Sequence, residues 1–400
     1  MSQSTRAEIY YDPFDPAIDV DPHSVWKRMR DEAPLWWNGR YEFWAISRFE
    51  DVWNAYHDTE TFSSTHGTML EVIGPEFIPP PIVIFMDPPD HEAMRKLVSR
   101  AFTPKRISAL EDYVRKLSDD YLEQYVGSDG FDFVQDFGGL IPPMVIGEML
   151  GVPESDRDQM RHWFDDFLHR EDDSSELSPR AAEAIGNVYV MAEQLIADRR
   201  KRPGDDMVTT LLEAEVEDGD RTRKLTDEEI ASFTMLLAGA GAETVARLLG
   251  FAGVTLARFP EQRTLLVEDP GLIKNAIEEL LRYEAPSPVN GRWTLKPFTM
   301  HGIDVPAGSK VLLLNGSANR DDREFDDPDA FDVRRDIKRH ITFGYGPHYC
   351  LGANLAKLEG RVALEELLRR FPTWDVDEDA LVRVQTSTVR GFKSVPISLR

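Results

Sequence analysis

The sequence predicts a mainly α-helical fold with a smaller β region, organised as a single domain over residues 1–400. Apolar residues recur at helical spacing through most of the chain, whereas strand-like alternation is confined to short segments. Strands and helices do not alternate as they do in a parallel α/β sheet. No internal repeat or long low-complexity linker divides the chain, and we interpret the acidic stretch 170–179 as a solvated loop between helices.

The clearest helix start is at Thr226. This residue can cap a helix while Glu229, three positions later, closes a capping box. The helix that follows should run to about Phe259 and stop near Pro260, which makes it far longer than the mean of about 11–12 residues. Further helices are expected at 24–32, 89–101, 106–125, 180–201, 271–283 and 351–370.

The β region is expected to be small. The strands expected are 42–47, 310–314 and the two arms of a hairpin within 382–399 that turns at Arg390 and Gly391. A dinucleotide-binding fold is excluded because the glycine pairs at 239/241 and 344/346 do not complete the required fingerprint after a strand.

Composition narrows the classes of partner. The chain has 46 Lys and Arg against 71 Asp and Glu, a net charge of −25, which argues against nucleic acid or an anionic membrane as a partner. One cysteine cannot form a disulfide within the chain or a multi-cysteine metal site, and it favours a reducing, cytoplasmic setting. The N-terminus lacks the apolar core of a secretory signal, and the apolar stretch 233–242 is too short to cross a membrane.

The single cysteine, Cys350, lies in the segment FGYGPHYCLG at 343–352. Its three glycines permit tight turns and the close approach of a bulky group. The helix expected after Cys350 directs its free N–H groups at the sulfur, which stabilises a thiolate. A lone cysteine is commonly an inert buried thiol. A glycine cage and a helix N-terminus around one thiol favour instead a single axial sulfur ligand for iron.

This segment resembles the haem-binding loop of the cytochromes P450, the haem-thiolate monooxygenases, whose pattern is Phe-Gly-x-Gly-x-His-x-Cys-x-Gly. The resemblance covers nearly the whole chain and fits the soluble bacterial type. It implies a P450 fold with the long helix over haem b (iron protoporphyrin IX), and Cys350 as the iron ligand, whose thiolate favours cleavage of the O–O bond. Other cofactor contacts implied in the loop are Phe343, Gly344, His348 and Gly352.

The long helix carries Ala240-Gly-Ala-Glu-Thr244, an acid beside a hydroxyl in mid-helix. From local sequence alone, close helix packing with a solvated Glu243 is the favoured interpretation of this stretch. The resemblance implies that it crosses the oxygen side of the haem, with Ala240 and Gly241 against the cofactor. Thr244 would then hydrogen-bond the reduced dioxygen or its water, and Glu243 would relay protons. Many family members have Asp where Glu243 stands, which leaves the coupling efficiency open.

Glu279 and Arg282 are three residues apart, a spacing typical of a surface ion pair worth about 0.2–0.5 kcal/mol. The two leucines between them indicate partial burial. The resemblance implies a structural role, in which this pair joins Arg335 and holds the loop that presents Cys350.

His91 and Arg95 are four residues apart in the opening turns of a helix, where the helix dipole disfavours cations. They therefore call for an anion, unless the neighbouring acidic residues screen them. The resemblance implies that the anions are the haem propionates, bound also by Arg292 and His348, because the arginine fork suits carboxylates.

The substrate pocket is implied by the resemblance to lie between the long helix and residues 65–85. The candidate lining residues are Leu237, Ala240, Val289 and Thr388. The proline-rich apolar run 78–85 favours a lipophilic small molecule such as a fatty acid, terpenoid or steroid. Simple packing of that run under a loop is an equally open interpretation.

Cations cluster at 95–106 and 334–339 despite the acidic total. In the family both stretches flank the proximal side, so we expect an acidic ferredoxin, reduced by its own NAD(P)H-dependent reductase, to dock there. Two alternatives are a haem-thiolate protein that binds a ligand without turnover and a peroxide-driven oxidase of the same fold. The Glu243–Thr244 pair favours oxygen activation, because only that chemistry needs a proton relay.

Overall fold

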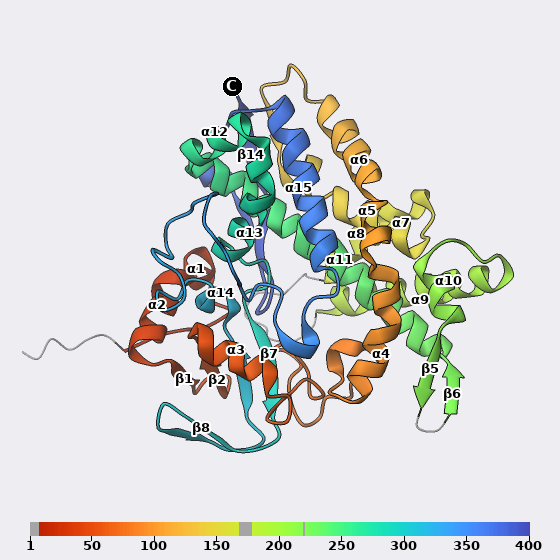
Figure 1. Cartoon of the computed structure of the whole chain (residues 1–400), viewed down its shortest axis with the longest axis vertical. Coiled ribbons are helices and arrows are strands. Elements are labelled where there is room, and N and C mark those ends of the chain that lie inside the picture. Colours follow the sequence, from red (N-terminus) through yellow and green to blue (C-terminus); the bar gives the residue numbers. More distant parts are fainter. Residues whose placement is uncertain (1–7, 168–177, 219–220) are drawn as a thin grey trace, which may run out of the picture.

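The computed structural model describes residues 8–167, 178–218 and 221–400, which form a mainly helical body with a smaller β region, as predicted (Figure 1). The α-helices are α1 (Pro16–Val20), α2 (Pro22–Glu32), α3 (Phe49–His57), α4 (Asp90–Val98), α5 (Pro104–Ser108), α6 (Glu111–Glu123), α7 (Ile141–Leu150), α8 (Glu154–Phe167), α9 (Pro179–Lys201), α10 (Met207–Glu213), α11 (Asp227–Arg258), α12 (Pro260–Glu268), α13 (Ile273–Tyr283), α14 (Asn315–Ala318) and α15 (Ala353–Arg370).

Helix α11 runs through the middle of the body and organises the main core. Its predicted capping box is present: the Glu229 N–H donates to Thr226 Oγ1 at 3.1 Å and the Thr226 N–H donates to Glu229 Oε2 at 2.8 Å. The helix ends at Arg258, directly before Phe259 and Pro260, as predicted. Among the described helices, α11 alone is long and apolar enough to cross a membrane, but 67% of its most apolar window is buried, so it is a core helix.

The strands form one five-stranded sheet and several smaller ones. The predicted strands 42–47 and 310–314 are confirmed as β2 and β10, which lie next to each other in the five-stranded sheet. The order is β1-β2-β10-β7-β3, with β10 parallel to β2 and antiparallel to β7. A three-stranded sheet has the order β11-β14-β4. The strands are β1 (Leu35–Asn38), β2 (Phe43–Ile46), β3 (Phe62–Ser63), β4 (Gly130–Asp132), β5 (Glu215–Asp218), β6 (Arg221–Lys224), β7 (Asn290–Thr294), β8 (Phe298–Met300), β9 (Ile303–Val305), β10 (Lys310–Leu313), β11 (Trp374–Val376), β12 (Val382–Gln385), β13 (Arg390–Ser394) and β14 (Pro396–Leu399).

The predicted turn of the C-terminal hairpin is wrong. Strands β12 and β13 are joined by a turn at 386–389, which Thr386 closes by accepting the Val389 N–H at 2.8 Å. Gly391 lies inside β13, opposite Val384. A Cβ there would lie 2.8 Å from the side chain of Arg247, so this glycine serves the close approach of α11 rather than a turn.

Two predicted helices are also interrupted. The stretch 106–125 is divided into α5 and α6, and 89–101 ends as α4 followed by a 3₁₀ turn at 99–102. Of the predicted loop 170–179, residues 170–177 lie outside the described residues, and Pro179 already begins α9.

Candidate functional site

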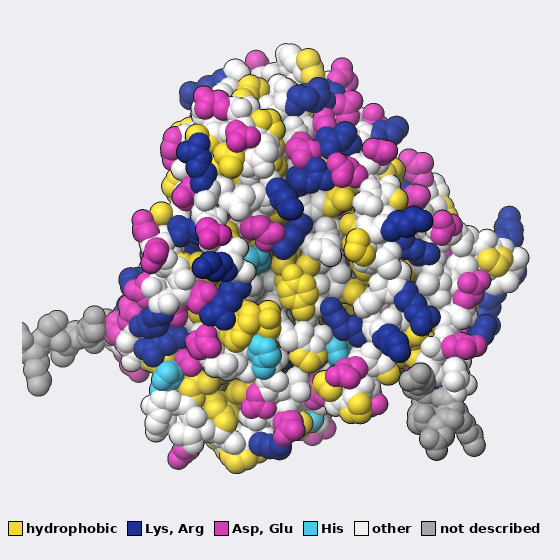
Figure 2. Space-filling model, viewed as in Figure 1, with side chains coloured by type: hydrophobic (Ala, Val, Ile, Leu, Met, Phe, Trp, Pro, Cys, Tyr) yellow, Lys and Arg dark blue, Asp and Glu magenta, His cyan; other side chains and the backbone are white. Residues whose placement is uncertain are grey.

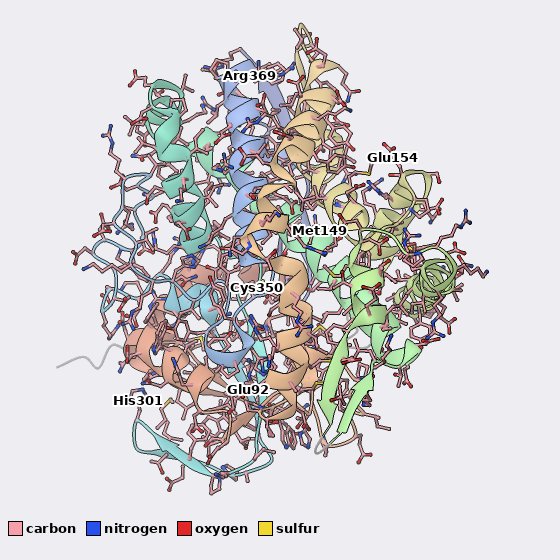
Figure 3. The ribbon with its side chains drawn as sticks, turned by 45° about the vertical axis from the view of Figure 1, so that its right-hand side comes forward. Glu92, Met149, Glu154, His301, Cys350 and Arg369 are labelled. Atoms are coloured by element: carbon pink, nitrogen blue, oxygen red, sulfur yellow. The ribbon has the colours of Figure 1, made fainter. Side chains whose placement is uncertain are left out.

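A cavity of about 420 Å³ lies where α11 faces the start of α15 and the loop before it. Figure 3 places Cys350 near the centre of the molecule, at one end of α15, with Arg369 at the other end of the same helix. The walls are mostly apolar. The lining residues contributed by α11 are Phe233, Leu236, Leu237, Ala240, Gly241, Thr244, Val245 and Leu248.

The loop that carries Cys350 is shaped by glycines. Gly344 and Gly346 both have φ of +66°, and a Cβ on Gly346 would lie 2.7 Å from the backbone oxygen of Tyr56. The Cys350 N–H donates to the Phe343 carbonyl at 2.9 Å, which fixes the loop. A Cβ on Gly352 would meet nothing nearer than the Cys350 sulfur at 4.0 Å, so open space lies beside the thiol.

The Cys350 side chain is surrounded by protein atoms but is exposed to the cavity that it lines. Burial has the largest effect and raises the pKa of the thiol. The N–H groups of Gly352 and Ala353 and the charge of Arg95 lower it, so the predicted helix N-terminus acts on the sulfur but does not outweigh burial. A bound metal cation deprotonates such a thiol outright, and the donor set therefore fits one thiolate ligand to iron.

Cationic groups without anions surround one end of the cavity. Arg292 is 4% exposed, and burial lowers the pKa of its guanidinium. Its Nη1 donates to its neighbour's carbonyl, that of Gly291, at 2.8 Å, while Arg95 donates to the carbonyl of Tyr349. Among the described residues no carboxylate lies within ion-pair distance of either arginine. A buried cation is costly unless an anion accompanies it.

Two histidines lie in the same region. His91 is 1% exposed and neither of its ring nitrogens has a hydrogen-bond partner, and its ring centroid is 4.3 Å from that of His348. Burial and nearby arginines lower the pKa of His91 to about 4 and that of His348 to about 2. Buried donors without acceptors indicate a missing group. The two propionates of a haem supply the carboxylates that this set lacks, so the predicted residues fit the cofactor.

Comparison with known proteins decides the family. The cytochrome P450 family pattern matches residues 175–392. The putative cytochrome P450 123 of Mycobacterium tuberculosis (strain H37Rv) is 41% identical over 98% of each chain. The vitamin D(3) 25-hydroxylase of Pseudonocardia autotrophica is 35% identical over 100% of this chain and 99% of its own. A mutant of P450 EryK, solved with erythromycin B, is 36% identical, with a TM-score of 0.87 over 96% of this chain and 97% of its own.

The chain is a cytochrome P450. It is therefore a haem-dependent monooxygenase, and its fold is the P450 fold. When bound, haem iron with a thiolate ligand activates dioxygen for insertion into a C–H bond. Within this P450 the loop 343–352 would present Cys350 to the iron, and the cationic group described above would hold the propionates.

We predict that Arg292→Gln weakens haem binding at least about tenfold, because a hydrogen bond to a charged group contributes about 1.5–3 kcal/mol. The rate of haem transfer from the holoenzyme to an excess of apomyoglobin measures this. Arg40→Gln is the control, since Arg40 is 69% exposed, pairs with Asp12, lies over the Tyr41 ring and does not line the cavity. Equal haem loss from both variants would contradict the assigned role of Arg292.

Four predicted residues of α11 line the cavity of this P450: Leu237, Ala240, Gly241 and Thr244. The Thr244 hydroxyl donates to the Ala240 carbonyl at 2.9 Å, so its oxygen remains free to accept a hydrogen bond from the cavity side. A Cβ on Gly241 would lie 2.9 Å from the Ile146 side chain of α7. The helix packing that the sequence left open as an alternative is therefore present as well.

Glu243 does not line this cavity. Its side chain is 10% exposed, and its Oε2 accepts from Arg247 Nη2 at 2.5 Å. The pair borders a separate small pocket with Gln135 and Arg161. The Glu243 carboxylate is thus next to Thr244 in sequence but is directed toward Arg247 and away from the cavity.

The predicted structural residues come together in full. Glu279 and Arg282 are both completely buried and form a two-pronged pair, with Nε–Oε2 at 2.6 Å and Nη2–Oε1 at 2.8 Å. Arg335 adds its Nε to Glu279 Oε1 at 3.1 Å. Arg282 also donates to the carbonyls of Asn319, Pro328 and Ala330 at 3.0, 2.8 and 3.1 Å.

Three of the four predicted pocket residues, Leu237, Ala240 and Thr388, line the cavity. Val289 does not: its side chain packs in a neighbouring core with Trp26 and borders a separate small pocket, because the chain alternates as it enters β7 and turns Asn290 to the cavity instead. Sequence reasoning missed several lining residues. These include Phe102, Phe233 and Leu236, whereas Thr68 and Met69 belong to the predicted segment 65–85. The helical spacing of 233, 237, 240 and 244 could have found Phe233.

Proposed function

We propose that this P450 uses haem b to hydroxylate a bulky lipophilic small molecule in the cytoplasm, taking electrons from a separate ferredoxin and its NAD(P)H-dependent reductase. The reaction is R–H + O₂ + 2 e⁻ + 2 H⁺ → R–OH + H₂O. The observation that carries the proposal is the apolar cavity beside Thr244. The chain's own residues bind the substrate, exclude water around it and supply a hydrogen-bonding hydroxyl.

The wall chemistry supports a large apolar substrate. Apolar side chains such as Val83, Ile84 and Phe233 supply most of the wall area, and polar ones such as Asn290 and Thr388 supply less. The named activities of two relatives, on vitamin D(3) and on erythromycin, also involve large molecules. A steroid-sized substrate therefore fits better than a fatty acid.

A spectral screen tests the substrate class. Testosterone, palmitic acid and camphor are each titrated into the ferric holoenzyme, and displacement of the iron-bound water is followed by the Soret shift. We expect the steroid to give the largest shift at the lowest concentration. A response to palmitic acid alone would indicate that the substrate class is a fatty acid and not a steroid. No response to any of the three compounds would contradict a lipophilic substrate.

We predict that Thr244→Ala lowers the yield of hydroxylated product per NADH consumed and raises hydrogen peroxide release, because the hydroxyl that manages protons at the haem is lost. Product, NADH and peroxide are measured together in the reconstituted system. Thr234→Ala is the matched control: Thr234 lies on the same helix and makes the same bond to the carbonyl four residues before it, at 2.8 Å, but does not line the cavity. A peroxide-driven oxidase would be favoured by either of two results. One is an unchanged yield of product per NADH in Thr244→Ala, and the other is turnover with peroxide alone that equals turnover in the reconstituted system.

The proposed ferredoxin surface lies over α4 and α5. Lys96, Arg100 and Lys105 are exposed there and have no ion-pair partner among the described residues. Arg95 of α4 donates to the carbonyl of Tyr349, directly before Cys350, so this basic segment is next to the Cys350 loop. Figure 2 shows Lys and Arg side chains in dark blue on this face of the molecule. The second predicted cluster, 334–339, offers fewer unpaired cations to a partner than the sequence predicts.

In that second cluster two arginines are already paired with carboxylates of the same chain. Arg335 is held by buried Glu279, and Arg339 pairs with Glu324 at 2.8 Å and with Glu50 at 3.4 Å. Their charges are therefore neutralised locally. The attraction to an acidic partner rests mainly on α4 and α5.

We predict that Lys105→Glu slows reduction by ferredoxin about two- to tenfold at low ionic strength, because charge complementarity raises association rates. The difference should shrink as salt is added. Stopped-flow reduction at several salt concentrations measures this. The control is Lys393→Glu, which makes the same charge change at an exposed lysine of β13. A reduction rate that changes neither with salt concentration nor in Lys105→Glu would contradict this docking surface.

A further inference from the structure

Two loops that are far apart in the sequence both contribute to the cavity wall. The first is 64–75, which follows β3 and supplies Thr68 and Met69. The second is the turn at 386–389 between β12 and β13, which supplies Thr388. The shape of the cavity between them depends on how these two loops are held against each other.

One residue pair joins the two loops. The Ser387 hydroxyl donates to Glu71 Oε2, and the Ser387 N–H donates to Glu71 Oε1 at 3.4 Å. Ser387 is only 3% exposed and Glu71 is half-buried, so both bonds are partly shielded from water. Within the described residues no other hydrogen bond links 64–75 to 386–389, and Glu71 forms no ion pair.

The first loop is braced independently of this pair. The Gly74 N–H donates to the His66 carbonyl at 2.9 Å, and the Gly291 N–H of β7 donates to the Thr68 carbonyl at 2.8 Å. Gly67 has φ of +101°, and a Cβ there would lie 2.9 Å from the Ile73 backbone. The loop therefore keeps its own shape whether or not Glu71 is present.

The turn is braced independently as well. Thr386 accepts from the Val389 N–H at 2.8 Å, and its hydroxyl donates to the Val389 carbonyl at 2.9 Å. At the base of the turn, the Arg390 N–H donates to the Pro286 carbonyl at 2.9 Å, and the Arg390 side chain pairs with buried Glu284. Loss of the pair would thus leave two intact loops and change only the distance between them.

We propose that Glu71 and Ser387 are positioning residues that set the width of the substrate cavity, and thereby select for bulky ligands that touch both loops. The inference rests on the proposed function, since it concerns the same cavity. Small ligands that need only the iron and its immediate surroundings do not contact the two loops together. The pair should therefore affect affinity for large ligands and leave affinity for small ones unchanged.

The test compares two ligands that bind haem iron through nitrogen, the small imidazole and the bulky clotrimazole, in ferric holoenzyme. In Glu71→Ala and in Ser387→Ala we expect the Kd for clotrimazole to rise by up to about tenfold, because the affinity can change by no more than the hydrogen bond between the loops contributes. The Kd for imidazole should stay the same. The double variant should bind clotrimazole no more weakly than either single variant, because both remove one interaction. Ser387→Thr keeps the hydroxyl and should restore clotrimazole binding.

Two results would overturn the proposal: an unchanged Kd for clotrimazole, or an equal rise for both ligands, which would indicate general damage to the haem site. The reduced carbon monoxide spectrum of the unaltered protein separates this from failure of the proposed function. A normal P450 band with no change in ligand selectivity contradicts only the role of Glu71 and Ser387. An absent band contradicts the proposed function itself.

Discussion

Replacing Cys350 with serine is expected to abolish both turnover and the absorption band of the reduced carbon monoxide complex that gives the P450s their name. Cys350 is the only cysteine, so no other thiolate can take its place. A serine hydroxyl is a harder and far weaker ligand for iron than a thiolate. The N–H groups of Gly352 and Ala353 that face the sulfur would then face a neutral oxygen.

Cys350→His separates loss of the thiolate from loss of the haem. Imidazole also binds iron, so this variant should retain haem, with a band at the position typical of nitrogen ligation. Circular dichroism of both variants checks that the helices remain. A Cys350→Ser protein that kept the thiolate band, or that still hydroxylated substrate, would overturn the assignment of the iron ligand.

The long helix shows why some elements are predictable from sequence. Its start is encoded by Thr226 and Glu229, and its end by Pro260. Each of these signals lies within a few residues of the helix end that it marks. Helix α7 carries no such signal: apart from the exposed Glu148 its residues are apolar, because most of the helix is buried against α11 and α8, so no polar stripe marks its period. The turn at 386–389 was missed because Gly391 is required by contact with Arg247, a neighbour that only the tertiary structure brings near.

The residues of the site likewise fall into those that the sequence could predict and those that it could not. Cys350 and the glycines around it are contiguous, and local chemistry sufficed to single them out. Glu243 and Thr244 are also contiguous, yet a helix turns adjacent residues about 100° apart, and the structure sends one to the cavity and the other to Arg247. Ser387 and Glu71 have no sequence signal at all, since their relation depends on a contact across 316 positions.

Glu279→Gln is expected to destabilise the protein by about 3–5 kcal/mol, because it leaves Arg282 and Arg335 without their shared buried anion. The shape of the side chain is preserved, so the effect isolates charge. For a chain of this length, that corresponds to a fall of about 4–6 °C in the midpoint of thermal unfolding. Differential scanning calorimetry of the holoenzyme measures it. Glu378→Gln is the control, because its pair with Arg258 is about half exposed on both sides and should change the midpoint by about 1 °C or less.

The loss should also reach the haem, because the buried pair is connected to the Cys350 loop. Arg282 donates to the Asn319 carbonyl at 3.0 Å, and the Asn319 side chain accepts from the Ile341 N–H and donates to the Thr342 hydroxyl, both at 2.7 Å. Those two residues directly precede the loop at 343–352. Glu279→Gln should therefore lose haem faster than Glu378→Gln does at a temperature where both remain folded. Equal midpoints and equal haem loss would mean that the pair neither stabilises the fold nor positions the loop.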